Sequence, residues 1–167
     1  MTGVSFLASF LATGRLHGIG IGSALADVDR AFRHPFVDVV GDEGDWLRRD
    51  YGLVEFAFNP GADWVLATAT VQLHRLASDD DLAAAWARST GIEFPRYVSW
   101  EELWDEVSRA HDAPELRIRD QGGFLEYRAL RSNVSVLVVD DEDEERGRRV
   151  GDGDVWSLDL WAPARPS

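Results

Sequence analysis

The sequence contains neither cysteine nor lysine, and each absence excludes a class of function. Without cysteine the chain has no disulfide, no thiolate nucleophile and no cysteine-bound zinc. All 17 cations are arginines, set against 30 aspartates and glutamates, so the formal net charge is −13. These arginines form no basic stripe. Because nucleic acids and anionic membranes are bound through clustered cations, we expect neither as a partner.

Long hydrophobic runs are also missing. The apolar stretch at residues 4–12 is too short to span a bilayer and has no basic residue before it. Its large apolar residues, Phe6, Leu7, Phe10 and Leu11, recur at the spacing of one helical face, which predicts an amphipathic helix. A reducing, cytoplasmic location is therefore expected.

The material for a hydrophobic core is plentiful. Hydrophobic residues make up 45% of the 167 positions, and seven of them are tryptophan. A chain of this length buries enough surface to fold without a metal or disulfide. We therefore expect a single domain over residues 1–167, with residues 163–167 as a tail.

Caps, turns and hydrophobic periodicity predict both helices and strands. The capping-box sequence Ser99-Trp-Glu-Glu102 begins one helix, and the turn cluster at residues 59–63 joins two alternating segments into a hairpin. Helices are expected over residues 4–12, 23–32, 78–91 and 99–110, and strands over 53–58, 64–73, 115–119, 123–130, 134–139 and 155–160. This order predicts an α+β fold in which helices pack on one face of an antiparallel sheet.

The order of these elements repeats along the chain. Residues 1–76 and 77–162 each contain two helices followed by a meander of strands. The two segments are either similar halves of a duplicated domain or unrelated parts of one domain, because their sequences share too little identity to decide.

No motif predicts catalysis, a cofactor or a metal. The segment Gly18-Ile-Gly-Ile-Gly22 lacks the preceding strand and glycine spacing of a dinucleotide site, and no lysine is present for a P-loop. We interpret it as a corner that leads into a helix. The four histidines have no metal-ligand spacing, and no serine lies in a nucleophile motif. Among the abundant carboxylates, Glu55 and Glu126 on expected strands face either solvent or a cleft.

Two kinds of residue are candidates for binding another protein. The first is an acidic run, which predicts a solvated loop or an acidic projection that enters a basic cleft. The second is tryptophan outside the expected core, a residue type enriched at protein-binding hot spots. The candidates are Trp46, Trp100, Trp161, Asp140, Asp141, Glu142, Asp143, Glu144 and Glu145.

The glycine corner and the following strand carry a resemblance to a known group of proteins. The segment from Gly18 through Asp27-Val-Asp-Arg-Ala-Phe32, followed by Tyr51-Gly-Leu-Val-Glu-Phe56, resembles immunity proteins of bacterial polymorphic-toxin systems. A looser similarity in fold is to β-lactamase-inhibitor-protein and SmpA/BamE-like domains. The resemblance covers about residues 16–73 and implies helices packed on antiparallel strands. No binding residue is assigned to this chain from the resemblance.

The expected function is therefore binding rather than catalysis. The leading hypothesis is an immunity-type inhibitor that occludes a cognate toxin, with a basic toxin domain as the partner. One alternative is a small enzyme or ligand-binding protein that uses a cleft between helices and sheet. Another is a scaffold or assembly subunit.

Overall fold

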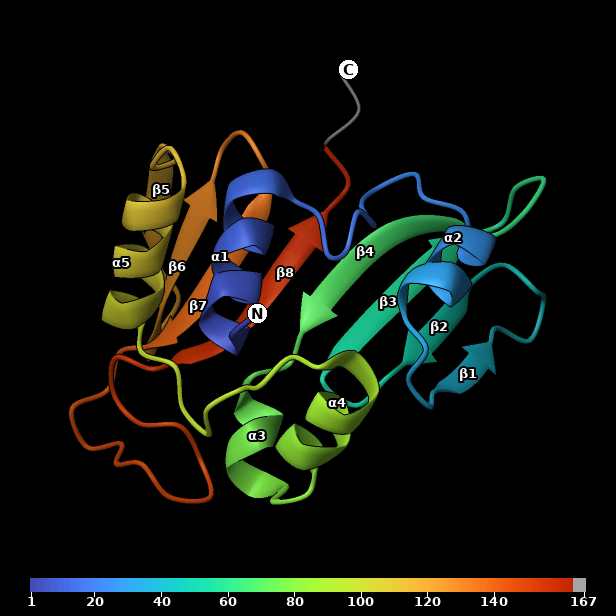
Figure 1. Cartoon of the computed structure of the whole chain (residues 1–167). Coiled ribbons are helices and arrows are strands. Elements are labelled where there is room, and N and C mark those ends of the chain that lie inside the picture. Colours follow the sequence, from blue (N-terminus) through green and yellow to red (C-terminus); the bar gives the residue numbers. More distant parts are fainter. Residues whose placement is uncertain (164–167) are drawn as a thin grey trace.

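The computed structural model describes residues 1–163 and shows one twisted antiparallel sheet with five helices (Figure 1). The expected tail at residues 163–167 lies, beyond its first residue, outside the described part. The helices are α1 (Gly3–Thr13), α2 (Leu25–Ala31), α3 (His74–Ser78), α4 (Leu82–Thr90) and α5 (Trp100–Ala110). The strands are β1 (Val37–Val40), β2 (Leu47–Asp50), β3 (Val54–Asn59), β4 (Val65–Val71), β5 (Leu116–Asp120), β6 (Phe124–Ala129), β7 (Val134–Val139) and β8 (Val155–Trp161).

The eight strands have the order β1-β2-β3-β4-β8-β7-β6-β5, and each neighbouring pair is antiparallel. Each expected half thus supplies a four-stranded meander, and the last strands of the two meanders, β4 and β8, pair at the centre. The boundary expected between residues 76 and 77 falls inside α3. That the two halves arose by duplication remains one of the two alternatives.

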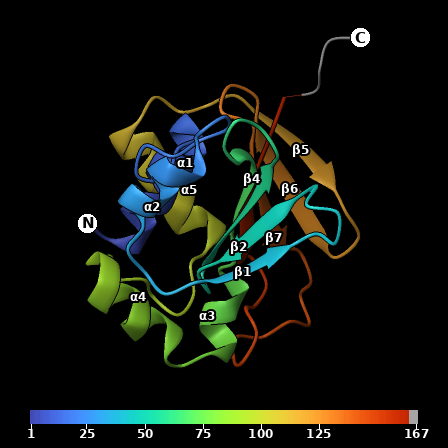
Figure 2. The same ribbon diagram turned by 90° about the vertical axis from the view of Figure 1, so that its right-hand side faces the viewer.

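Four of the five helices lie over one face of the sheet, whereas the short helix α3 reaches the opposite face through Arg75, which bonds to Asp50. Figure 2 shows α1, α2, α4 and α5 on the same side of the strands. The four apolar residues expected on one face of α1, Phe6, Leu7, Phe10 and Leu11, are all buried in the core. From the sheet, alternating residues such as Phe56 and Val136 face these helices and are fully buried. The predicted fold class is confirmed.

The glycine corner attaches α2 to the sheet. His17 and Gly18 both have positive φ, as a tight two-residue turn requires, and this turn closes the pair Leu16 and Ile19. The chain then pairs with the start of β4: Gly22 N–H donates to the Leu66 carbonyl, and Leu66 N–H donates to the Ser23 carbonyl. The turn and these bonds give the glycine segment at residues 18–22 a structural role, as the corner that leads into α2.

Two predicted helix starts were wrong. Ser23 does not cap α2; its hydroxyl accepts a bond from Gly20 N–H within the corner, and the helix begins at Leu25. The helix expected over residues 78–91 corresponds to α4 and begins later, at Leu82; the expected cap residue, Ser78, is the last residue of the separate helix α3. Between them the carboxylate of Asp79 accepts from Asp81 N–H in a turn.

Strands β1 and β2 were missed by the sequence reasoning. Each has four residues, and β2 places Arg49 at a position that faces the helices. Arg49 is only 4% exposed because its guanidinium bonds to the carboxylates of Asp29 and Asp38. A buried arginine breaks the apolar alternation that identifies a strand. Residues 41–46 join these two strands.

Candidate functional site

The acidic run lies in an ordered loop, residues 140–154, between β7 and β8. Arg146 donates two bonds to Asp154, from Nε at 2.9 Å and from Nη2 at 2.6 Å. Asp154 is 1% exposed, and its carboxylate also accepts from Gly151 N–H at 2.9 Å. The bond to Asp154 raises the pKa of Arg146. The loop therefore folds around an ion pair of its own, between a buried carboxylate and a half-exposed guanidinium, in place of the free projection that the sequence suggested as one alternative.

Further contacts attach this loop to the rest of the molecule. The Tyr97 hydroxyl donates to the Gly147 carbonyl at 2.5 Å, and Arg148 donates to the Ser78 carbonyl at 2.7 Å. Val150 is buried against Ala77 in a small second core. An anchored loop presents its outward-facing carboxylates in a fixed arrangement.

The loop is joined to the start of α5 by backbone bonds. Trp100 N–H donates to the Gly153 carbonyl at 2.9 Å, and Ser99 forms an isolated β-bridge with Asp154. The predicted capping box holds this helix start, since Ser99 and Glu102 exchange both expected bonds. Trp100 is consequently placed beside the acidic loop, although about forty residues separate them in the sequence.

A surface depression of about 650 Å³ lies between the loop, the start of α5 and strands β6 and β7. Trp100 and Tyr127 form an aromatic wall, and their rings stack with centroids 4.1 Å apart. The carboxylates that line it include those of the predicted candidates, Asp140, Glu144 and Glu145, and also Asp152. We call this feature the acidic-aromatic depression. It combines two residue types that recognise cations. Arg146, paired with Asp154, lines it as well.

The other predicted residues are placed elsewhere. Asp141, Glu142 and Asp143 lie on the exposed outer part of the same loop. Trp46 is 41% exposed in the turn before β2, and Trp161 is 51% exposed at the end of β8 remote from the loop. Trp100 is half-buried against Trp104 and Tyr127, whereas the sequence placed it among the more exposed tryptophans.

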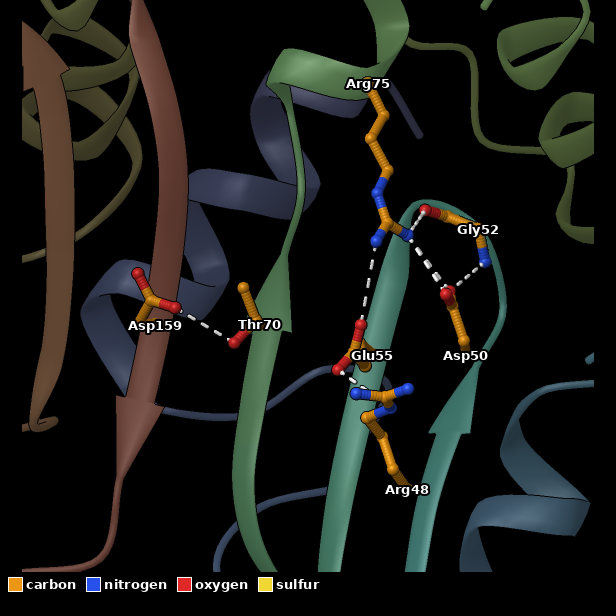
Figure 3. Close-up of polar contacts among 7 residues, drawn as sticks. All are labelled: Arg48, Asp50, Gly52, Glu55, Thr70, Arg75 and Asp159. Atoms are coloured by element: carbon orange, nitrogen blue, oxygen red, sulfur yellow. Dashed lines mark hydrogen bonds and ion pairs between the residues drawn. The ribbon is translucent and has the colours of Figure 1, made fainter. Parts of the chain in front are cut away.

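The sheet face opposite α1, α2, α4 and α5 carries a second polar group, of which sequence reasoning singled out only Glu55. One register row crosses seven strands without an apolar residue: Asp50, Glu55, Thr70, Asp159, Ser135, Arg128 and Arg117. Figure 3 shows Arg75 reaching from α3 to the first members of this row. Its Nη1 atom bonds to Asp50 at 3.1 Å and to the Gly52 carbonyl at 2.8 Å. Its Nη2 atom lies 3.7 Å from Glu55.

Asp159 sits in the middle of this row, on the central strand β8. It accepts hydrogen bonds from the hydroxyls of Thr70, at 2.9 Å, and Ser157, at 3.0 Å (Figure 3 shows the first). Burial raises the pKa of its carboxyl group, and the two hydroxyl bonds oppose that effect. The only sequence signal for this row was the polar alternation on each separate strand, which does not reveal the register between strands.

Within residues 1–163, no group of three or more histidine, cysteine, aspartate or glutamate side chains is placed to hold a metal ion. In the same part of the chain, no helix has the length and apolar character needed to cross a membrane. A second surface depression of about 690 Å³ lies between the end of α1 and the segment that joins α5 to β5.

Comparison with known proteins gives no family. No family model matches the chain, and no curated protein matches it. Among solved structures, a DUF4309 family protein (YjgB) from Bacillus subtilis is 16% identical over 95% of each chain, with a TM-score of 0.44. A similarity this low supports no argument about function.

Proposed function

We propose that the protein is a non-enzymatic binding module that occludes a basic protein, acting as an immunity-type inhibitor of a cognate toxin in the cytoplasm. The observation that carries this proposal is the acidic-aromatic depression, where the stacked rings of Trp100 and Tyr127 adjoin Glu144 and Glu145. The resemblance of residues 16–73 to immunity proteins agrees with it.

The depression fits a basic side chain that projects from a partner. An arginine or lysine over the aromatic wall gains about 0.5–2 kcal/mol from the ring electrons. Carboxylates at the rim accept charge-assisted hydrogen bonds from the same group. Because the loop is already held by Arg146 and Asp154, little conformational entropy is lost when the partner binds.

The charge of the whole chain supports a basic partner. The loop at residues 140–154 contains eight carboxylates and three arginines, and the full chain has a net charge of −13. Such a field attracts a cationic protein over distances comparable with the Debye length and accelerates encounter. For a toxin inhibitor, fast capture is the useful property.

Co-expression tests the proposal. The proposal requires an adjacent gene that encodes a toxin domain, and that domain is the probe, produced alone or together with the chain. We expect the wild-type chain to protect the cells and to form a complex with the purified toxin domain. The variant Glu144→Gln/Glu145→Gln, which neutralises the rim of the depression, should lose protection or need a much higher expression level.

The matched control is Glu93→Gln/Glu115→Gln, which removes the same charge from exposed positions outside the depression. It should protect like the wild type. The proposal is wrong if the wild-type chain neither binds nor protects, or if the rim variant and the control variant protect equally.

A further inference from the structure

The two edges of the sheet differ in how they are protected. Edge strand β5 presents Arg117, Arg119 and Asp120 to solvent around one exposed apolar residue, Ile118. Charged residues on an edge strand hinder pairing with another strand. Edge strand β1 is different: Val37, Val39 and Val40 are exposed, to 66%, 39% and 52%.

Within residues 1–163, no strand pairs with the outer side of β1. Gly41 N–H donates to the Trp46 carbonyl, which sets the phase of the β1–β2 ladder. By the alternation of antiparallel pairing, Val37 and Val39 then bond inward to β2, and Asp38 and Val40 direct their N–H and C=O groups outward.

Asp38, the one charged residue of β1, is already neutralised. Its carboxylate accepts from Nε of Arg49 at 2.8 Å and from Nη2 at 3.0 Å. A strand added to this edge would therefore meet no free carboxylate on the helix side and an apolar surface on the other. Phe36, 44% exposed under the Arg49 guanidinium, lies on the helix side together with Asp38.

The charges at the two ends of β1 indicate what covers it. Before the strand lies Arg33, which is exposed and takes part in none of the ion pairs found within residues 1–163. After the strand comes the acidic turn with Asp42, Glu43 and Asp45. Two copies paired antiparallel place the basic end of each β1 beside the acidic end of the other, so the strand is complementary to itself.

We propose that β1 is a homodimer interface in which two copies pair their β1 strands antiparallel about a two-fold axis, with Val39 facing Val39 of the second copy. Side chains alternate between the two faces along a strand, so a shift of the pairing by one residue would move every side chain to the other face. With Val39 opposite Val39, Val37 and Val39 of both copies lie on the same face of the joined sheet. The pairing joins both sheets into one. It goes beyond the proposed inhibition and leaves residues 140–154 free in both copies, since β1 and the β7–β8 loop lie in opposite halves of the sheet.

The test is the mass of the full chain in solution, by sedimentation equilibrium over a range of concentrations. We expect twice the 18.6 kDa of one chain for the wild type at micromolar concentration. Val39→Lys should give the monomer, and the matched edge variant Ile118→Lys on β5 should stay dimeric. A monomeric wild type, a dimeric Val39→Lys, or equal loss in both variants would overturn the proposal.

Charge reversal provides a second test that does not alter the apolar strand. Arg33→Glu and Glu43→Arg should each raise the dimer dissociation constant by about tenfold, because each reverses two symmetry-related contacts. When the two variants are mixed, both contacts become favourable again, so a heterodimer should form with near wild-type affinity. Failure of the mixture to form a heterodimer while the single variants remain folded contradicts the pairing.

Discussion

At the scale of single residues, the most informative side chain is Asp159. It is a carboxylate on the central strand, held by the hydroxyls of Thr70 and Ser157 and partly removed from water. Burial disfavours its ionised form, so its pKa in the folded protein is raised. The folded protein therefore retains this proton to higher pH than the unfolded chain does, and ionisation of Asp159 costs stability near neutral pH.

Asp159→Asn should accordingly stabilise the protein at pH 7 by on the order of 1 kcal/mol, because the amide keeps hydrogen bonds to both hydroxyls without carrying a buried charge. The gain should shrink as the pH falls towards about 3, where the carboxyl is protonated in both states. Urea unfolding at both pH values measures this. A loss of stability of equal size at both pH values would show that the charge is not the cause.

At the scale of elements, the loop at residues 140–154 depends on one buried carboxylate. Asp154→Asn retains the shape of the side chain but removes the charge that binds Arg146. We expect the free energy of unfolding to fall by about 1–3 kcal/mol, since Arg146 is half-exposed and water replaces part of the lost contact.

The specific consequence is loosening of the loop, which is measured by amide hydrogen exchange over residues 140–154. Exchange there should accelerate more than in β3 and β4. The control Asp143→Asn, at an exposed position of the same loop, should leave exchange unchanged. Equal protection of the loop in both variants would mean that the Arg146–Asp154 pair does not hold it.

The elements also show how far sequence reasoning reaches. The α1 helix, the β3–β4 hairpin, the Ser99 capping box and strands β5 to β8 follow from periodicity and caps, and the structure confirms them within about two residues at each end. Strands β1 and β2 were not predicted from the sequence, because both are short, β1 is exposed along its length, and β2 buries an arginine. Helix α3 was not predicted either, because five residues are too few to show the spacing of apolar residues that identifies a helix.

At the scale of the whole molecule, the sheet order decides what comes together. Trp100 and the acidic run were separate candidates in the sequence, and the β-bridge between Ser99 and Asp154 makes them neighbours. Trp46 and Trp161 were equal candidates, yet Trp46 precedes β2 near one edge of the sheet and Trp161 ends the central strand β8. Contacts between residues this far apart depend on strand register, which one sequence does not specify.

The charge of the molecule leads to the central claim, that the chain binds a basic protein through the acidic-aromatic depression. The most direct measurement is the association rate with the neighbouring toxin domain as ionic strength rises from about 50 to 500 mM, where the Debye length shortens severalfold. We predict that the wild-type rate falls at least about tenfold. Glu144→Gln/Glu145→Gln should bind more weakly with a shallower salt dependence, and Glu93→Gln/Glu115→Gln should follow the wild type. An association rate that is independent of salt, with both variants binding like the wild type, would contradict the account.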